Sequence, residues 1–152
     1  MNDFSTLKLS PEMIENLTAM GYTTMTPIQA AAIPEIMNNH DVLAQAKTGS
    51  GKTAAFTIGL LQHLNPTQPQ VQALVLCPTR ELSEQVAIEM RRLARYTSNI
   101  KILLLCGGTP IKPQTQSLEH QAHIVVGTPG RIGDHLRRGT LKLDYLSTLV
   151  FA

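Results

Sequence analysis

The sequence predicts an α/β fold, in which a parallel sheet carries helices on both faces. Three observations support this. Short apolar runs alternate with longer amphipathic stretches through most of the 152-residue chain. The runs are rich in Val, Ile and Leu, as buried parallel strands are. Gly, Pro and polar residues separate the two kinds of segment. Strands that alternate with helices form βαβ units, and right-handed crossovers place the helices on both faces.

Composition limits the classes of protein that fit. A length of 152 residues with 43% hydrophobic residues allows one domain with a real core. No apolar run approaches the ~18 residues of a membrane span, so we expect no membrane partner and a cytoplasmic location. The net charge of +2 does not by itself indicate a nucleic-acid binder. Cys77 and Cys106 lie in apolar runs without a CxxC pair, which predicts buried free thiols.

Two helices are predicted before residue 40. Ser10 is a suitable N-cap for the first, and Gly21 ends it. The second begins at Thr26-Pro27. Pro34 is predicted to kink or break this second helix.

The remaining elements alternate. Predicted strands cover residues 41–46, 73–78, 101–106, 123–127 and 148–151. Predicted helices cover residues 52–64, 79–96, 113–120 and 129–138. In a parallel sheet the carboxyl ends of the strands share one edge, where ligands bind. The loops after the strands are therefore the candidate binding segments.

The stretch "AKTGSGKT" (46–53) lies between a predicted strand and a predicted helix. It fits the phosphate-binding P-loop, with Ala46 in place of the usual first Gly. Gly49 and Gly51 allow backbone N–H groups to fold around phosphate oxygens. Lys52 supplies a charge for the β and γ phosphates, and Thr53 offers a hydroxyl to Mg²⁺. The start of the helix adds its dipole, so the stretch predicts a nucleotide site.

Four further stretches accompany this loop in a fixed order. They are "GYTTMTPIQ" (21–29) with Phe4 upstream, "PTREL" (78–82), "GG" (107–108) and "TPGR" (128–131). Together they resemble the N-terminal RecA-like domain of DEAD-box RNA helicases, from Phe4 to Phe151. The resemblance is closest to a bacterial branch of the family that acts in ribosome assembly. It implies a RecA-like P-loop NTPase fold that is incomplete at its C-terminus. Residues 1–152 would form a partial domain, and residues 1–40 would be its N-terminal extension that reads adenine.

The resemblance implies a site for ATP or ADP with Mg²⁺. Gln29 would read the adenine edge through its amide, which can donate and accept at once. The same residue also fits a capping box with Thr26, and both roles can hold. Phe4 would pack on the base, with Tyr22 nearby. Lys52 is the expected catalytic residue and Thr53 the metal ligand. The phosphate-binding residues would be Ala46, Lys47, Thr48, Gly49, Ser50, Gly51, Lys52 and Thr53.

The resemblance also implies an RNA site on the loops that follow the strands. The expected contacts go to phosphate and sugar, and they carry little sequence information. Free N–H groups at helix starts suit phosphates, and the two arginines either add charge or pair with nearby acids. The expected RNA-binding residues are Thr79, Arg80, Gly107, Gly108, Thr128 and Arg131.

The acids that complete such a site are missing from these 152 residues. In the family, Asp-Glu-Ala-Asp follows the strand at 148–151, and its first Asp would stand at Ala152. We therefore expect the ATP-binding and RNA-binding part of an ATP-dependent RNA helicase, which by itself does not hydrolyse ATP efficiently. A second RecA-like domain would be its partner. An exposed sheet edge at 148–151 would permit a non-native dimer.

Two other functions fit parts of the sequence. A stand-alone nucleotide- or RNA-binding module without catalysis would share every motif present here. A small-molecule P-loop kinase can be complete at about this size. However, forty-five residues precede the P-loop, and they resemble an adenine reader rather than a kinase segment.

Overall fold

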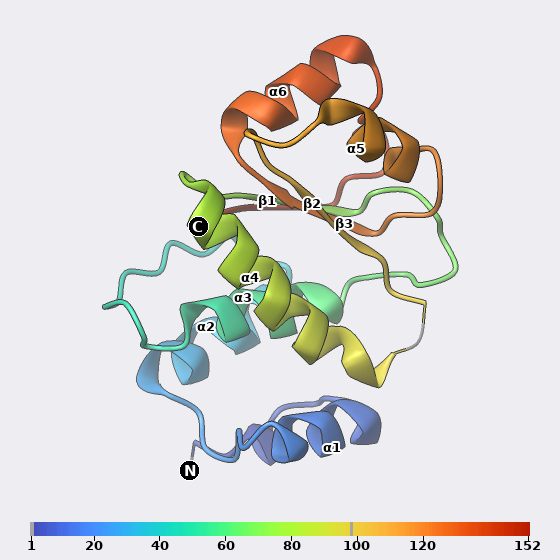
Figure 1. Cartoon of the computed structure of the whole chain (residues 1–152). Helices are drawn as coiled ribbons and strands as arrows, with labels where there is room; N and C mark the ends of the chain where they lie inside the picture. Colours follow the sequence, from blue (N-terminus) through green and yellow to red (C-terminus); the bar gives the residue numbers. More distant parts are fainter. Residues whose placement is uncertain (1, 98) are drawn as a thin grey trace. The chain divides into compact units, whose positions relative to one another are not determined.

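The computed structural model describes residues 2–97 and 99–152, shown in Figure 1. These residues form two compact units. The first consists of the chain up to His63 and of a segment that begins at Glu89. The second consists of Leu64–Ile88 and Asn99–Ala152. The first unit is helical, and the second is built on a parallel sheet.

Short helices make up the first unit, and their ends follow the capping signals of the sequence. The Ser10 hydroxyl accepts a hydrogen bond from the Met13 amide at 3.1 Å. Beyond that helix, Gly21 adopts a φ of 83°, which favours glycine. The predicted start and end of the first helix are therefore confirmed. The elements of this unit are η1 (Phe4–Thr6), α1 (Pro11–Ala19), α2 (Pro27–Met37), α3 (Lys52–Leu61) and η2 (Ala94–Tyr96).

Pro34 does not break α2, so of the two predicted outcomes, a kink or a break, the break is wrong. The helix continues to Met37, and the Asn38 amide donates to the Pro34 carbonyl at 3.1 Å. Proline removes the single hydrogen bond that its own N–H would have made to the carbonyl of Ala30. The neighbouring side chains Ala32 and Ile33 are buried, and this burial holds the helix together across the missing bond.

The longest helix of the described residues is α4 (Arg80–Leu93), with 14 residues, and it contributes to both units. Its end lies in the first unit, where the Asn16 amide donates to the carbonyls of Arg92 and Leu93 at 3.0 and 3.1 Å. Asn16 thus binds carbonyls that the helix itself leaves without a partner. No helix in the described ranges is both long enough and apolar enough to cross a membrane.

Four parallel strands form the sheet of the second unit, in the order β2-β3-β1-β4. Ala73 pairs with Ile124 on one side and with Thr148 on the other, so the strand ends are level. The parallel sheet and four of the five predicted strands are confirmed. The strands are β1 (Ala73–Leu76), β2 (Ile102–Leu105), β3 (Ile124–Gly127) and β4 (Thr148–Phe151).

Two further helices, α5 (Ile111–Leu118) and α6 (Pro129–Arg138), cover one face of this sheet. Figure 1 shows them on one side and the first half of α4 on the other. Apolar side chains from the strands, from α6 and from the loops beside them form a buried core on the α5–α6 face. This core contains Val71, Leu74, Leu103, Leu105, Ala122, Val125, Ile132 and Leu141.

The strand predicted over 41–46 does not form. In the described ranges this segment joins no ladder, and its side chains lie in solvent, with Val42 40% and Leu43 101% exposed. An extended segment becomes a strand only when its N–H and C=O groups meet a neighbouring strand. The run "DVLAQA" has a local propensity for the extended conformation, but this propensity does not provide a strand to pair with.

Candidate functional site

The P-loop is positioned by the start of α3. Gly51 is the N-cap residue of this helix and adopts a left-handed conformation with a φ of 88°, and Gly49 has a φ of 83°. In the described ranges no side chain caps α3. The first N–H groups of a helix have no partner within it, so those of α3 face the inside of the loop unpaired. This geometry suits phosphate oxygens.

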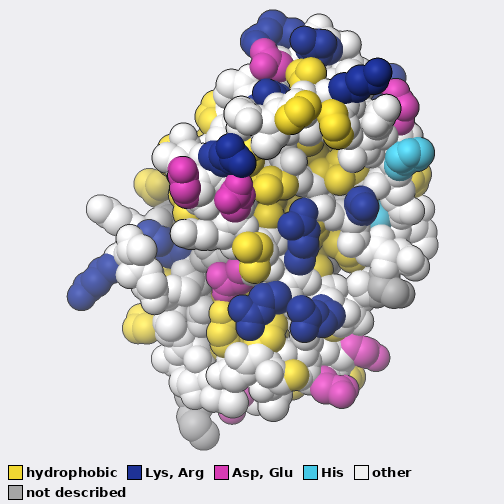
Figure 2. Space-filling model, in the orientation of Figure 1, with side chains coloured by type: hydrophobic (Ala, Val, Ile, Leu, Met, Phe, Trp, Pro, Cys, Tyr) yellow, Lys and Arg dark blue, Asp and Glu magenta, His cyan; other side chains and the backbone are white. Residues whose placement is uncertain are grey.

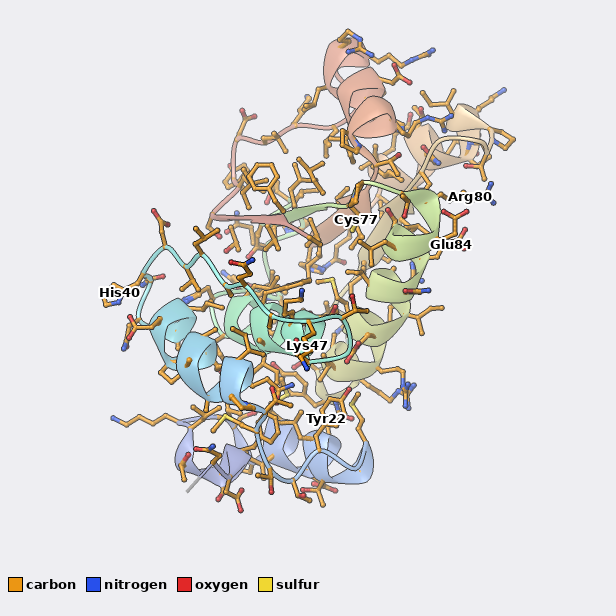
Figure 3. All side chains as sticks on the ribbon, turned by 90° about the vertical axis from the view of Figure 1, so that its left-hand side faces the viewer. Tyr22, His40, Lys47, Cys77, Arg80 and Glu84 are labelled. Atoms are coloured by element: carbon orange, nitrogen blue, oxygen red, sulfur yellow. The ribbon has the colours of Figure 1, made fainter. Side chains whose placement is uncertain are left out.

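Lys52 closes the loop on itself. Its Nζ donates a hydrogen bond to the carbonyl of Ala46 at 2.5 Å, across the full span of the loop. A second contact fixes the tip, where the Ser50 hydroxyl donates to the carbonyl of Lys47 at 2.5 Å. Figure 3 shows Lys47 on this loop. The ammonium group of Lys52 therefore already lies where the loop would hold a phosphate, with a carbonyl oxygen as its partner.

Gln29 connects α2 to the P-loop. Its Oε1 accepts a hydrogen bond from the Thr26 amide at 2.9 Å, and the Thr26 hydroxyl accepts from the Gln29 amide. This capping box was predicted and is confirmed. Nε2 of Gln29 donates to the carbonyl of Gly51 at 3.1 Å. One N–H and one lone pair of the side-chain amide remain for another partner, so capping and base reading are compatible.

The same side chain explains why residue 51 is glycine. A Cβ atom at Gly51 would collide with Nε2 of Gln29 and lie 3.0 Å from its Cδ. The positive φ of Gly51 also disfavours every other residue. The segment predicted to read the base and the loop predicted to hold the phosphates therefore touch directly in the first unit.

Phe4 and Tyr22 form an aromatic pair beside this segment. Their ring centroids are 6.4 Å apart and the planes are inclined by 16°. Phe4 is buried, and the Tyr22 hydroxyl donates to Oε1 of Glu89 at 2.7 Å. Phe4 therefore packs on Tyr22 in this state and would have to be uncovered before it could pack on a base. Its predicted role, like that of Tyr22, stays a prediction.

Burial raises the pKa of Tyr22 to about 12, and the hydrogen bond to Glu89 adds to the shift. The folded chain thus holds this proton more tightly than the unfolded chain does. The stabilisation is complete below the ordinary tyrosine pKa of 10.0 and is lost as the pH rises through about 12.

We expect an absorbance titration to show this. A tyrosinate step near pH 12 should disappear in Tyr22→Phe, because the residue that causes it is gone. It should persist in the control Tyr145→Phe, which removes a tyrosine that is 53% exposed. A step that survives in Tyr22→Phe would contradict the assignment.

The loops predicted to bind RNA lie at the carboxyl ends of the strands in the second unit. The Thr79 hydroxyl accepts from the Leu82 amide at 3.2 Å and so caps the start of α4. Thr128 behaves differently, because its hydroxyl accepts from the Gly107 amide at 3.3 Å. Among the described residues no side chain caps α6. Phosphate-binding N–H groups are therefore open at α6 and partly used at α4.

Both arginines of these loops pair with acids, which is one of the two alternatives that the sequence left open. Nε of Arg80 lies 3.1 Å from Glu84, and Figure 3 shows the two side chains side by side on α4. Arg131 lies 3.9 Å from Asp134 and is only 14% exposed. Figure 2 shows Lys and Arg side chains interspersed with Asp and Glu, in keeping with the net charge of +2. Any binding of RNA here would rely on local contacts rather than on a broad basic field.

Sequence reasoning missed a polar network beneath these loops. Its centre is Gln114 of α5, which contacts Thr109, Arg131 and His135. A weak signal was present, because Gln114 lies four positions before Leu118, on the same face of the helix predicted over 113–120. A glutamine at such a position predicts a buried partner.

Cys77 and Cys106 are buried free thiols, as predicted. Burial raises the pKa of both, and a hydrogen bond with Ser83 opposes the shift. Figure 3 shows Cys77 where β1 leads into α4. Burial and a raised thiol pKa are typical of structural rather than reactive cysteines.

A Mg²⁺ site at Thr53 would depend on the nucleotide. In the described ranges no group of three or more His, Cys, Asp or Glu side chains could hold a metal ion. Mg²⁺ commonly takes one or two protein ligands and completes its shell with phosphates and water. Thr53 in the uncapped first turn of α3 fits that pattern, with the phosphates as the main ligands.

The order of these loops and the P-loop is characteristic of one family. The DEAD/DEAH box helicase family matches residues 26–151 of this chain. The chain belongs to this family. It is 60% identical over 151 residues to the ATP-dependent RNA helicase DbpA of Escherichia coli strain K12, a match that covers 99% of this chain and 33% of that protein. It is also 44% identical to the DEAD-box ATP-dependent RNA helicase CshA of Geobacillus kaustophilus, over 99% of this chain and 32% of that protein.

Solved DEAD-box structures share the fold. A crystal structure of a DEAD box protein from the hyperthermophile Methanococcus jannaschii matches with a TM-score of 0.92 and 42% identity, over 98% of this chain and 40% of that one. The structure of S. cerevisiae Dbp5 bound to RNA and ADP BeF3 matches with a TM-score of 0.89 and 31% identity, over 99% of this chain and 38% of that one. The predicted DEAD-box resemblance and RecA-like fold are confirmed. The chain spans about a third of the length of the curated relatives named above.

Proposed function

We propose that this chain binds ATP or ADP and the backbone of RNA, as part of a DEAD-box ATP-dependent RNA helicase that couples duplex unwinding to ATP hydrolysis. The observation that carries the proposal is the contact between Gln29 and Gly51. It joins the predicted adenine reader to the predicted phosphate loop in one site. The names of the relatives and the RNA-bound Dbp5 structure support both ligands.

Nucleotide binding would exchange the partner of Lys52. The ammonium group leaves the carbonyl of Ala46 and takes a phosphate oxygen, while the free amides of the first turn of α3 bind the others. Thr53 would hold Mg²⁺, whose charge would offset that of the phosphates. Gln29 keeps its cap on α2 and offers its remaining amide groups to the base.

RNA binding would use the carboxyl edge of the sheet in the second unit. The open N–H groups at the start of α6 bind one phosphate, and the glycines at 107 and 108 allow the strand to approach the backbone closely. Arg80 lies over this loop, since a Cβ at Gly108 would be 3.1 Å from its Nη1. These contacts read the backbone rather than the bases.

Turnover would need acids that these 152 residues do not contain, since Asp-Glu-Ala-Asp is absent from them. By themselves they would hydrolyse ATP slowly, and an RNA-stimulated ATPase that Lys52→Ala abolishes would contradict this. A second RecA-like domain would supply an arginine finger, worth about 10³–10⁵ in rate in related NTPases. We also propose that this helicase acts in the cytoplasm and in ribosome assembly, as the resemblance of its motifs implies.

Calorimetric titration with ADP and GDP in the presence of Mg²⁺ tests the nucleotide site. We expect ADP to bind roughly 10-fold more tightly or better, because a bidentate amide contact to a base is worth ~1–3 kcal/mol of discrimination. Gln29→Glu should lose this preference, because a carboxylate still caps α2 but has no N–H to donate.

The matched control is Gln62→Glu, which changes a glutamine at the other end of α3 and should leave the preference unchanged. Equal affinity of the unchanged chain for ADP and GDP would rule out the role given to Gln29.

The free edge of β4 makes self-association a further expectation. Within the described residues β4 pairs only with β1, and Leu149 and Phe151 are 49% and 76% exposed. We propose that two copies associate along this edge at high concentration, because unpaired backbone groups invite another strand. Light scattering after size-exclusion chromatography should show a dimer that Leu149→Lys suppresses. Leu136→Lys, at a leucine of α6 that is 42% exposed, should not suppress it. A monomer at every concentration would contradict the proposal.

A further inference from the structure

The side-chain amide of Gln114 makes four hydrogen bonds. Its Nε2 donates to the carbonyl of Cys106 and to the hydroxyl of Thr109, both at 3.1 Å. Its Oε1 accepts from Nη1 of Arg131 at 3.1 Å and from Nε2 of His135 at 2.8 Å. These four bonds use the full capacity of an amide. Two of them reach the loop after β2, and two reach α6.

Arg131 and His135 fix the orientation of this amide. A guanidinium only donates, so the amide atom that faces Nη1 of Arg131 is Oε1. The ring of His135 is buried, and its Nε2 lies 2.8 Å from the same oxygen, so this nitrogen carries a proton. Its Nδ1 lies 2.7 Å from the hydroxyl of Thr140. Burial lowers the pKa of His135, and Arg131 and Arg138 lower it further, while Asp134 acts against them. The ring therefore stays neutral, and a flipped amide would leave buried groups without partners.

Arg131 extends the connection to the loop backbone. Besides its bond to Gln114, its Nη1 donates to the carbonyl of Thr109 at 2.9 Å. The Gly107 amide in turn binds the hydroxyl of Thr128. The loop at 106–109 is thus held from α5 and from α6 at the same time. These bonds to Gln114 oppose a shift of this loop relative to the start of α6.

We propose that Gln114 is a positioning residue for RNA binding. It holds the glycine loop and the start of α6 in one arrangement before the RNA strand arrives. The inference rests on the proposed function, which assigns both segments to RNA. A site that is already ordered loses less conformational freedom on binding, so it binds more tightly. Gln114 is half-buried and acts through the loop and the helix start that it binds.

The test compares Gln114→Leu with Gln116→Leu, an exposed glutamine on the same helix. Fluorescence anisotropy with a labelled single-stranded oligouridine measures RNA affinity, and calorimetry with ADP measures nucleotide affinity. We expect Gln114→Leu to weaken RNA binding roughly 5- to 20-fold through the lost pre-organisation. ADP affinity should not change, whereas a general loss of folding would lower both. Gln116→Leu should match the unchanged chain in both assays.

Hydrogen exchange without RNA provides a second readout. The amides of residues 107–109 should exchange faster in Gln114→Leu and normally in Gln116→Leu. If Gln114→Leu does not fold, Gln114→Glu replaces it, because a carboxylate still accepts from Arg131 and His135 but donates nothing to Cys106 or Thr109.

The outcomes separate the two proposals. Equal RNA affinity or equal exchange in the Gln114 and Gln116 variants would overturn the role of Gln114 while the proposed function stands. Failure of the unchanged chain and of Gln116→Leu to bind RNA would overturn the proposed function, and the inference with it. A loss of RNA affinity that is confined to the Gln114 variant supports both the proposed function and the role of Gln114.

Discussion

Replacing Lys52 with alanine is expected to weaken ADP binding by roughly 10- to 100-fold. A charge-assisted hydrogen bond is worth about 1.5–3 kcal/mol, and Lys52 is the side chain placed to make one with a phosphate. The ammonium group already lies across the mouth of the loop, 2.5 Å from the carbonyl of Ala46. Calorimetric titration with ADP and Mg²⁺ measures the change.

Lys8→Ala is the matched control, because Lys8 is an exposed lysine of the same unit. It should bind ADP like the unchanged chain. Circular dichroism should show that both variants fold, since alanine is well tolerated at the first position of a helix. ADP binding that is equally tight in Lys52→Ala would mean that the phosphates do not lie in this loop.

Replacing Gly127 with alanine is expected to cost ~3 kcal/mol of the free energy of unfolding. A Cβ at this position would collide with the carbonyl oxygen of Leu105 and lie 2.8 Å from Cδ1 of Ile132. The colliding atom belongs to the backbone of a paired strand and cannot move aside, so the strain of overpacking remains. The same carbonyl accepts the Thr128 amide at 3.2 Å, so the start of α6 would be disturbed as well.

Thermal unfolding followed by circular dichroism checks this expectation. The midpoint should fall by about 6–12 °C for a chain of this size. Gly130→Ala provides the control, because a Cβ there meets nothing within 4 Å and the residue lies in a helix. Its midpoint should stay the same or rise slightly. Equal midpoints for the two variants would show that β3 can shift to accept a side chain.

The strands at 73–76, 102–105, 124–127 and 148–151 could be predicted because each lies in an apolar run that a buried parallel strand requires. The segment at 41–46 has the same pattern and remains unpaired and exposed. The apolar pattern indicates only the local conformation that a segment favours. Strand pairing depends on a neighbouring strand from elsewhere in the chain. Pro34 shows the same limit, because burial of Ala32 and Ile33 outweighs the local effect of proline.

The candidate site divides in the same way. The P-loop, its glycines and the capping box of Gln29 follow from residues close together in the sequence. The bond from Gln29 to Gly51 joins residues 22 positions apart, and no spacing rule predicts it. The bonds of Gln114 to Arg131 and His135 span 17 and 21 positions. Sequence reasoning assigned Arg131 to the RNA loops without finding the amide that holds it.

The family, the order of the elements and the loops that carry the chemistry follow from the sequence, because these depend on local spacing and on motifs. Which polar groups are paired follows only from the folded structure. It places the hydroxyl of Thr128 on the Gly107 amide rather than on its own helix, and the ammonium group of Lys52 on the carbonyl of Ala46. The physical reason is that nearly every donor or acceptor removed from water takes a partner within the protein, and the fold brings that partner from a distant part of the chain.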